Sequence, residues 1–325
     1  MSKKLVILGT GGTIAGVAEH PLHHVAYKAA QLDVAQLLAQ VPTAGTAAYT
    51  VHTEQVFQCD SKDMDFSHWL QLAQRVQHYL QCDDVAGVVI THGTDTLEES
   101  AFFLSQVMPA RILACKPVVF TCAMRPATSL QSDGPQNLFD ALVVASSPGA
   151  CGVLVVCGGS LHLAKYVQKT HTYRLDAFDS GDAGALGVIE EGQLRLMYHW
   201  PAPDLHAPPH DLQHLASTTW PRVEIILSYA GVHPATVMAL CAPPEAGVPP
   251  VQGLIVAGTG NGTLHHHLEA ALLQVQAQGV SVLRCSRCAR GRVVQQSGAT
   301  SLIQPAADLS VVKARIALML SLMQM

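Results

Sequence analysis

The sequence predicts an α/β protein with two domains, each a three-layer α/β/α sandwich, the larger one N-terminal and the smaller one C-terminal. Short apolar runs alternate with longer amphipathic segments, which is typical of alternating strands and helices. The chain of 325 residues has about twice the length of a typical domain. A proline-rich stretch with little periodicity interrupts the alternation at residues 201–221.

The expected strands are short runs rich in valine, isoleucine and leucine, bounded by glycine, proline or polar residues. The sequence predicts them at residues 5–8, 85–90, 117–121, 152–157, 223–228, 253–257 and 281–284. Between them, apolar residues recur at helical spacing. These segments predict helices at residues 34–41, 67–80, 97–108, 138–146, 264–278 and 309–322.

The proline-rich stretch contains five prolines and several histidines, and it predicts a linker between the domains with the boundary near residue 215. The N-terminal domain then spans residues 1–200, the linker residues 201–221, and the C-terminal domain residues 222–325.

Composition excludes several classes of protein. Charged residues make up 13% of the chain, against about 25% in an average globular protein, and apolar residues make up 49%. Intrinsic disorder needs the opposite balance. A net charge of −5 without a cationic cluster predicts no nucleic-acid partner, and no apolar run reaches the about 18 residues of a membrane-spanning helix. So few charges indicate that a large subunit interface covers part of the surface.

Nine cysteines without regular spacing indicate free thiols in a reducing compartment, and therefore a cytoplasmic protein. One Cys-x-x-Cys pair, Cys285 and Cys288, accompanies three histidines at residues 265–267. A closed zinc site needs four ligands and the second pair is missing, so we expect no metal.

The first polar motif is GTGGTIAG at residues 9–16, directly after the first predicted strand. Its glycines permit a close backbone approach, so that amide N–H groups could surround an anionic oxygen. The spacing differs from the dinucleotide fingerprint G-x-G-x-x-G. A tight turn between strand and helix and an anion site both remain open at this point.

The second motif is VVITHGTDTLEES at residues 88–100, where a buried strand runs directly into polar residues. Open α/β sheets bind ligands at this end of their strands. Thr96 and Glu99 also fit a capping box, so helix capping is an alternative that can coexist with catalysis.

Thr13 and Thr94 both follow apolar strands and could face one cavity. A threonine is a poor nucleophile without a base, for which Lys169 in a polar run is a candidate if its amine is neutral.

These motifs, followed by KPVVFTCAMRPATSLQSDGPQNL at residues 116–138 and GTGNGTL at residues 258–264, resemble the bacterial-type L-asparaginase family of amidohydrolases over essentially the whole chain. The resemblance implies hydrolysis of L-asparagine to L-aspartate and ammonia, sometimes with L-glutamine as a second substrate. It further implies no metal or organic cofactor and a homotetramer built from two intimate dimers. Cytoplasmic and periplasmic members both fit, and the missing leader favours the cytoplasm.

The resemblance also implies catalytic roles. Thr13 matches the nucleophilic threonine on a loop that closes over the substrate, and Tyr27 matches the tyrosine of that lid. Thr94, Asp95 and Lys169 match the second threonine, the aspartate and the lysine. The sequence does not decide which threonine forms the covalent intermediate, although the family places Thr13 first.

For substrate binding, the resemblance implies that Asp95 pairs with the α-ammonium and that Asp60 and Ser61 hold the α-carboxylate. The backbone carbonyl of Ala123 would receive the leaving amide nitrogen. Asn261 would reach the site of a neighbouring subunit, so the C-terminal domain would complete that site.

Two departures bear on the choice between asparagine and glutamine. Lys62 stands where many members carry a glutamine that helps hold the ammonium, so it must point away or assist the carboxylate. The family's intersubunit glutamate has no equivalent, because Gln295 and Gln296 are the residues present. A nucleotide-binding protein, or a non-catalytic amino-acid-binding protein on the same scaffold, is the alternative.

Overall fold

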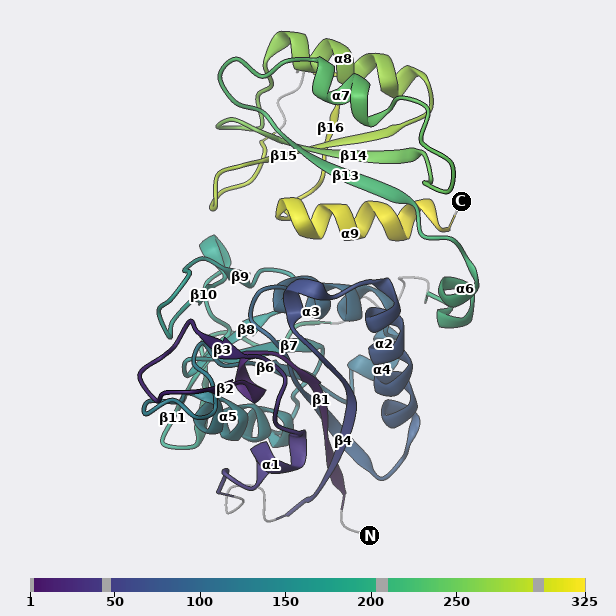
Figure 1. Cartoon of the computed structure of the whole chain (residues 1–325). Helices are drawn as coiled ribbons and strands as arrows, with labels where there is room; N and C mark the ends of the chain where they lie inside the picture. The colour runs from purple at the N-terminus through teal and green to yellow at the C-terminus, as the bar shows by residue number, and fades with distance from the viewer. Residues whose placement is uncertain (1–2, 43–47, 203–209, 295–300, 325) are drawn as a thin grey trace. The chain divides into compact units, whose positions relative to one another are not determined.

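The computed structural model describes residues 3–42, 48–202, 210–294 and 301–324 (Figure 1). The chain divides into two compact units, Met1–Ala216 and Ser217–Met325. Each unit contains a sheet of mainly parallel strands with helices on both faces. The predicted α/β class, with a larger N-terminal and a smaller C-terminal part, is confirmed.

The N-terminal unit is built on an eight-stranded sheet. Its strands are β1 (Lys4–Gly11), β4 (Thr50–Cys59), β5 (Val85–Thr91), β6 (Val118–Thr121), β7 (Val153–Cys157), β8 (Ser160–Leu163), β11 (Gly187–Glu190) and β12 (Gln193–Leu196). They lie in the order β12-β11-β8-β7-β6-β5-β1-β4. The strands from β4 to β7 are parallel, whereas β8, β11 and β12 extend the sheet in antiparallel pairs.

Helices cover both faces of this sheet (Figure 1). They are α1 (Val34–Leu38), α2 (Phe66–Gln81), α3 (Leu97–Val107), α4 (Ala110–Leu113) and α5 (Gly134–Ser146). The pair α1 and α5 packs on one face, and α2 and α3 contact each other on the opposite face. Because the central strands are buried on both sides, they form continuous apolar runs, and burial of each large side chain stabilises the fold by about 1.5–3 kcal/mol.

Local signals explain where α2 begins and how it is anchored. The carboxylate of Asp65 accepts the backbone N–H of His68 at 3.0 Å and caps the first turn. Trp69 stacks on Phe103 of α3, with ring centroids 5.0 Å apart. At the other end of α2, Lys116 donates to the carbonyl of Leu80 at 2.9 Å, which satisfies one of the unpaired C-terminal carbonyls.

The sequence missed the elements that are short, polar or at an edge. They include the edge strand β4, the antiparallel extension β8, β11 and β12, the short helix α4, and two hairpins, β2 (Val17–Ala18) with β3 (Tyr27–Lys28) and β9 (Gln168–Lys169) with β10 (Phe178–Asp179). Few of these strands bury both faces, so they lack the apolar run by which a central strand is recognised. The predicted helix at residues 138–146 begins earlier, at Gly134, with Pro135 in its first turn.

The C-terminal unit has a four-stranded parallel sheet in the order β13-β14-β15-β16. Its elements are β13 (Arg222–Leu227), α7 (Ala235–Leu240), β14 (Val251–Gly258), α8 (His266–Ala277), β15 (Ser281–Ser286), β16 (Gln304–Pro305) and α9 (Val311–Leu322). Figure 1 shows α7 and α8 on one face of the sheet and α9 on the other.

A further helix, α6 (Leu212–Ser217), lies in the region predicted as a linker, of which residues 203–209 are outside the described part. Within the described ranges, no helix is long and apolar enough to cross a membrane.

Candidate active site

The two polar motifs follow β1 and β5, which are neighbouring parallel strands. The chain passes from β1 to α1 on one face of the sheet and from β5 to α3 on the other. Loops that diverge in this way leave a crevice at the carboxyl ends of the strands, where open α/β sheets bind ligands. Just before the strands end, Thr10 Oγ1 donates to the carbonyl of Thr91 at 2.9 Å.

The two loops touch through glycine. Gly12 has φ +82°, and a methyl group added to it would lie 2.2 Å from the Cα of Gly93. A side chain at Gly12 would therefore push the loops apart, whereas one at Gly93 would first collide with Ser61, 2.4 Å from its Oγ. The N–H of Gly12 donates to the carbonyl of Cys59 at 3.0 Å, which anchors this loop to the end of β4. Gly12 of the first motif thus serves a contact between loops, which disfavours the phosphate cradle of the nucleotide alternative.

Thr13 is the first residue of a short 3-10 helix, Thr13–Ala15, directly after this contact. Only 7% of the surface of Thr13 is exposed. Its Oγ1 lies 2.6 Å from the hydroxyl of Tyr27, and either group can donate in this bond. Burial raises the pKa of Tyr27, and the hydrogen bond with Thr13 opposes that shift. The tyrosine is therefore a neutral phenol at physiological pH.

The hairpin β2–β3, which carries Tyr27, is fastened to the loop after β6. The backbone N–H of Ala18 donates to Thr128 Oγ1 at 2.8 Å, and the N–H of Leu130 donates to the carbonyl of Pro21 at 3.1 Å. This docking holds the tyrosine over Thr13.

Thr94 and Asp95 both bond to Lys169. The lysine Nζ lies 2.8 Å from Thr94 Oγ1 and 2.6 Å from Asp95 Oδ1. The short strand β9, paired with β10, presents Lys169, and its backbone N–H donates to Glu98 Oε1 at 3.2 Å. An ammonium group can only donate, so the proton of Thr94 must point to another acceptor.

Ser61 joins this group through the backbone of the second motif. Its Oγ accepts the N–H of Asp95 at 3.2 Å, and its carbonyl accepts the hydroxyl of Thr96 at 2.7 Å. The capping box that Thr96 and Glu99 suggested is wrong, because the Thr96 side chain makes no bond to the first turn of α3. The hydroxyl instead ties this loop to Ser61.

Lys62 bonds to the acids of its own turn. Its Nζ lies 2.7 Å from Asp60 Oδ2 and 2.9 Å from Asp63 Oδ2, and these two bonds raise the pKa of Lys62. Its side chain is 60% exposed. Two neighbouring carboxylates thus largely neutralise the positive charge of Lys62.

The remaining predicted residues lie in two places. Ala123 follows β6 by two residues, at the same sheet edge, and is buried. Asn261 lies in the C-terminal unit, where its Oδ1 accepts the N–H of Val294 at 2.7 Å and its Nδ2 donates to the carbonyl of Val294 at 2.9 Å. Gln295 and Gln296 are outside the described residues. The structure therefore joins Thr13 to Tyr27, and Thr94 to Asp95, Lys169 and Ser61.

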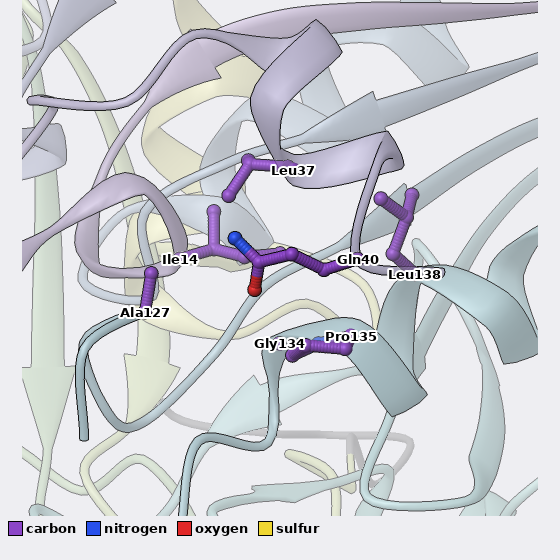
Figure 2. Close-up of a pocket in the computed structure, with 7 residues that line it drawn as sticks. All are labelled: Ile14, Leu37, Gln40, Ala127, Gly134, Pro135 and Leu138. Atoms are coloured by element: carbon purple, nitrogen blue, oxygen red, sulfur yellow. The ribbon is translucent and has the colours of Figure 1, made fainter. Parts of the chain in front are cut away.

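Two hollows lie near the first motif. Figure 2 shows a small crevice lined by Ile14, Leu37, Gln40, Ala127, Gly134, Pro135 and Leu138. At about 10 Å³ it has room for about one water and not for an amino acid. A hollow of about 630 Å³ lies along the hairpin and reaches Tyr27, and its size is typical of ligand sites.

Glu98 also contributes to the site, although the sequence did not predict this role. Its carboxylate accepts a hydrogen bond from the backbone N–H of Lys169. In the sequence it read only as an acidic residue in the first turn of a helix. Among the described residues, no three histidine, cysteine, aspartate or glutamate side chains gather closely enough to hold a metal ion.

Comparison with known proteins gives a consistent result. Residues 4–202 match the family model described as asparaginase, N-terminal, and residues 222–325 match the glutaminase/asparaginase C-terminal domain. The chain is 36% identical to L-asparaginase 2 of Bacillus subtilis, over 97% of this chain and 81% of that protein. It is also 36% identical to a glutaminase-asparaginase of Pseudomonas fluorescens, over 98% and 86% of the two chains. The crystal structure of a probable cytoplasmic L-asparaginase from Campylobacter jejuni superposes with a TM-score of 0.88 at 35% identity, covering 99% and 96%.

Proposed function

The chain belongs to the asparaginase family, and from this premise we propose that it hydrolyses the side-chain amide of L-asparagine to L-aspartate and ammonia. The observation that carries the proposal is the pairing of two threonine hydroxyls with proton-transfer groups at neighbouring strand ends, Thr13 with Tyr27 and Thr94 with Lys169. L-Glutamine is the proposed second substrate, as the name of the Pseudomonas relative suggests.

In the proposed reaction, Thr13 Oγ forms a bond with the amide carbon of the substrate. The threonine proton passes through the hydroxyl of Tyr27, which gives up its own proton as it accepts the other, because a neutral phenol cannot hold both. The carbon–nitrogen bond breaks as the nitrogen gains that proton, so ammonia leaves. Water then hydrolyses the resulting ester and restores the threonine.

Thr94 and Lys169 would act on the attacking water and on the charge that develops at the carbonyl oxygen. Because Lys169 donates to Thr94 Oγ1, the threonine can direct its own proton toward the substrate. Asp95 Oδ1 accepts the lysine and holds it in place, as the third member of a catalytic triad orients its base. In this arrangement Lys169 acts as an electrostatic group, because an ammonium has no lone pair with which to accept a proton.

The same residues suggest how the rest of the substrate is held. Asp95 uses Oδ1 for Lys169, and we assign Oδ2 to the substrate's α-ammonium. Ser61, buried and bonded to the N–H of Asp95, is assigned to the α-carboxylate together with the backbone of Asp60. The carbonyl of Ala123 is assigned to the leaving nitrogen. Because Lys62 is paired with Asp60 and Asp63, we expect it to weaken the binding of the substrate's ammonium group only slightly.

The direct test measures ammonia release by the purified protein from L-asparagine, with L-glutamine assayed in parallel. We expect turnover of L-asparagine, because both threonine pairs are assembled in the N-terminal unit. Absence of ammonia together with a thermal shift on adding the amino acid would support the binding-protein alternative. A thermal shift on adding ATP or NAD instead would support the nucleotide alternative.

We further infer a homotetramer of two intimate dimers in which Asn261 completes the site of a neighbouring subunit, and a cytoplasmic location. The low charge content favours extensive subunit contacts. Nine free cysteines and the likeness to a probable cytoplasmic enzyme favour the location.

The shared site can be tested by mixing inactive chains. Thr13→Ala and Asn261→Ala should each lower activity when expressed alone. When the two chains are co-expressed in equal amounts, half of the dimers are mixed and each mixed dimer has one intact site, so about a quarter of the wild-type activity should return. Separately purified and unmixed variants are the control. Activity no higher than the mean of the two variants would place Asn261 outside any neighbouring site.

A further inference from the structure

A third polar cluster lies behind the loop that carries Ala123. Asp133 Oδ2 accepts the backbone N–H of Met124 at 2.9 Å. Asn137, one turn further along the chain in α5, donates from Nδ2 to the carbonyl of Cys122 at 2.9 Å and to Asp133 Oδ2 at 3.1 Å. The backbone on both sides of Ala123 is therefore held by two side chains that are bonded to each other.

Because a peptide unit is planar, these hydrogen bonds fix the direction in which the carbonyl of Ala123 points. In a trans peptide unit, the C=O and the N–H point in opposite directions. The unit between Ala123 and Met124 is trans, so the bond from Met124 to Asp133 aims the carbonyl of Ala123 away from Asp133. The preceding unit is fixed as well, because Asn137 holds the carbonyl of Cys122.

The charge of Asp133 also acts on that carbonyl. A hydrogen bond from an N–H to a carboxylate shifts electron density toward the oxygen of the same peptide unit and makes it a stronger acceptor. Burial raises the pKa of the Asp133 carboxyl, while the N–H groups of Met124 and Arg125 oppose the shift. Asp133 occupies the N-cap position of α5, but its side chain makes no capping bond. Capping therefore does not explain why a charge is kept in this costly place.

We propose that Asp133 is a positioning residue for the leaving group, which acts through the peptide unit of Ala123 and Met124. It aims and polarises the carbonyl that accepts a hydrogen bond from the departing nitrogen. This inference rests on the proposed function, in which Ala123 receives that nitrogen. As the carbon–nitrogen bond breaks, the nitrogen gains a proton and its N–H groups become stronger donors, so the bond strengthens in the transition state.

Asn137 supports this arrangement from α5 by linking it to the end of the neighbouring strand β7. Its Oδ1 accepts the N–H of Gly158 at 3.0 Å, directly after β7, while its Nδ2 holds Asp133 and Cys122. The ends of β6 and β7 are thus joined through one amide, and Asp133 is kept at a fixed distance from the loop.

The test compares two substrates that differ only in the leaving group. L-Asparagine releases a nitrogen that carries N–H donors, whereas the β-methyl ester of L-aspartate releases an oxygen without them. Asp133→Asn keeps the shape, removes the charge and replaces one acceptor oxygen with a donor. In this variant kcat for the amide should fall by up to about 100-fold, the effect of losing one transition-state hydrogen bond altogether, while kcat for the ester changes less than about 3-fold. Gln136→Ala is the matched control, because this exposed side chain of the same helix bonds Asp140 instead. Equal losses for both substrates would show a merely structural role.

A second measurement needs no variant and so does not depend on how Asp133→Asn folds. Protonation of Asp133 removes the polarising charge, so in the wild-type protein the ratio of amide to ester turnover should fall as the pH drops through the raised pKa of this carboxyl. Ionisable groups that act on Asp133 include the Arg125 guanidinium and Cys122, and the pKa of Cys122 is raised by its hydrogen bond with Cys157 and by burial, so this thiol stays neutral in acid. A ratio independent of pH would overturn the proposal. A wild-type protein that releases no ammonia from L-asparagine would instead overturn the proposed function, so the two failures are distinguishable.

Discussion

Replacing Thr13 with alanine is expected to lower kcat for L-asparagine by at least about 10⁴-fold, the scale at which enzymes lose activity when their nucleophile is removed. The hydroxyl is held 2.6 Å from Tyr27 on a buried turn. Thr13→Val keeps the branched shape and should lose as much, whereas Thr13→Ser keeps the hydroxyl and should retain far more activity. Steady-state ammonia release measures all three.

The loss must come from chemistry rather than from folding. The melting temperatures of Thr13→Ala and Thr13→Val should stay close to the wild-type value, because the substitutions remove one hydroxyl without adding bulk. Rapid quenching of wild-type turnover, followed by mass spectrometry, should find one aspartyl group on the peptide that contains Thr13. An aspartyl group on the peptide of Thr94, or activity above about 1% in Thr13→Ala, would assign the nucleophile elsewhere.

Removing the second threonine or its lysine is expected to lower kcat by about 10³-fold in each case, because both act on the same developing charge. The informative result is the double variant. Thr94→Val and Lys169→Met remove the two ends of one hydrogen bond of 2.8 Å. If they act as a unit, the double variant should be hardly slower than either single one.

A control for charge lies four residues away in the sequence. Lys165 is exposed and sits near the ring of Tyr166, 5.2 Å from its centroid. Lys165→Met removes the same charge as Lys169→Met and should leave kcat unchanged. Fully multiplicative losses in the double variant would mean that Thr94 and Lys169 contribute independently, and the proposed coupling between them would be wrong.

The sequence predicted those parts of the fold in which burial and local pattern agree. The parallel strands β1, β5, β6 and β7 are covered on both faces, so their apolar runs stand out. Edge strand β4 mixes polar and apolar residues, because one side of it faces solvent, and its pattern is not distinctive. The short strands β9 and β10 owe their pairing to tertiary contacts, which no local pattern records.

In the candidate site too, local sequence patterns predicted some residues, whereas others depend on contacts between distant parts of the chain. The ends of β1 and β5 pointed to Thr13 and Thr94 as residues that follow buried strands. Lys169 was a candidate base because it lies in a polar run, but only the family resemblance paired it with Thr94, which is 75 positions away in the chain and meets it only in three dimensions. Tyr27 was found by the resemblance alone. Asp133 drew no notice in the sequence, because an acid before a glycine and a proline is an ordinary helix start. Only its bonds to the backbone of Met124 and Arg125 reveal another use.

The contact between Gly12 and Gly93 has a consequence for attempts to alter substrate preference. Because the backbones of Gly12 and Gly93 lie too close together to admit a side chain on Gly12, the loops that carry Thr13 and Thr94 are in direct contact, and we expect that neither loop can be reshaped alone. Directed evolution toward longer or bulkier amides should therefore accumulate changes in the hairpin that carries Tyr27 and in the turn that carries Ser61. Libraries that diversify Gly12 or Gly93 should yield mainly inactive clones.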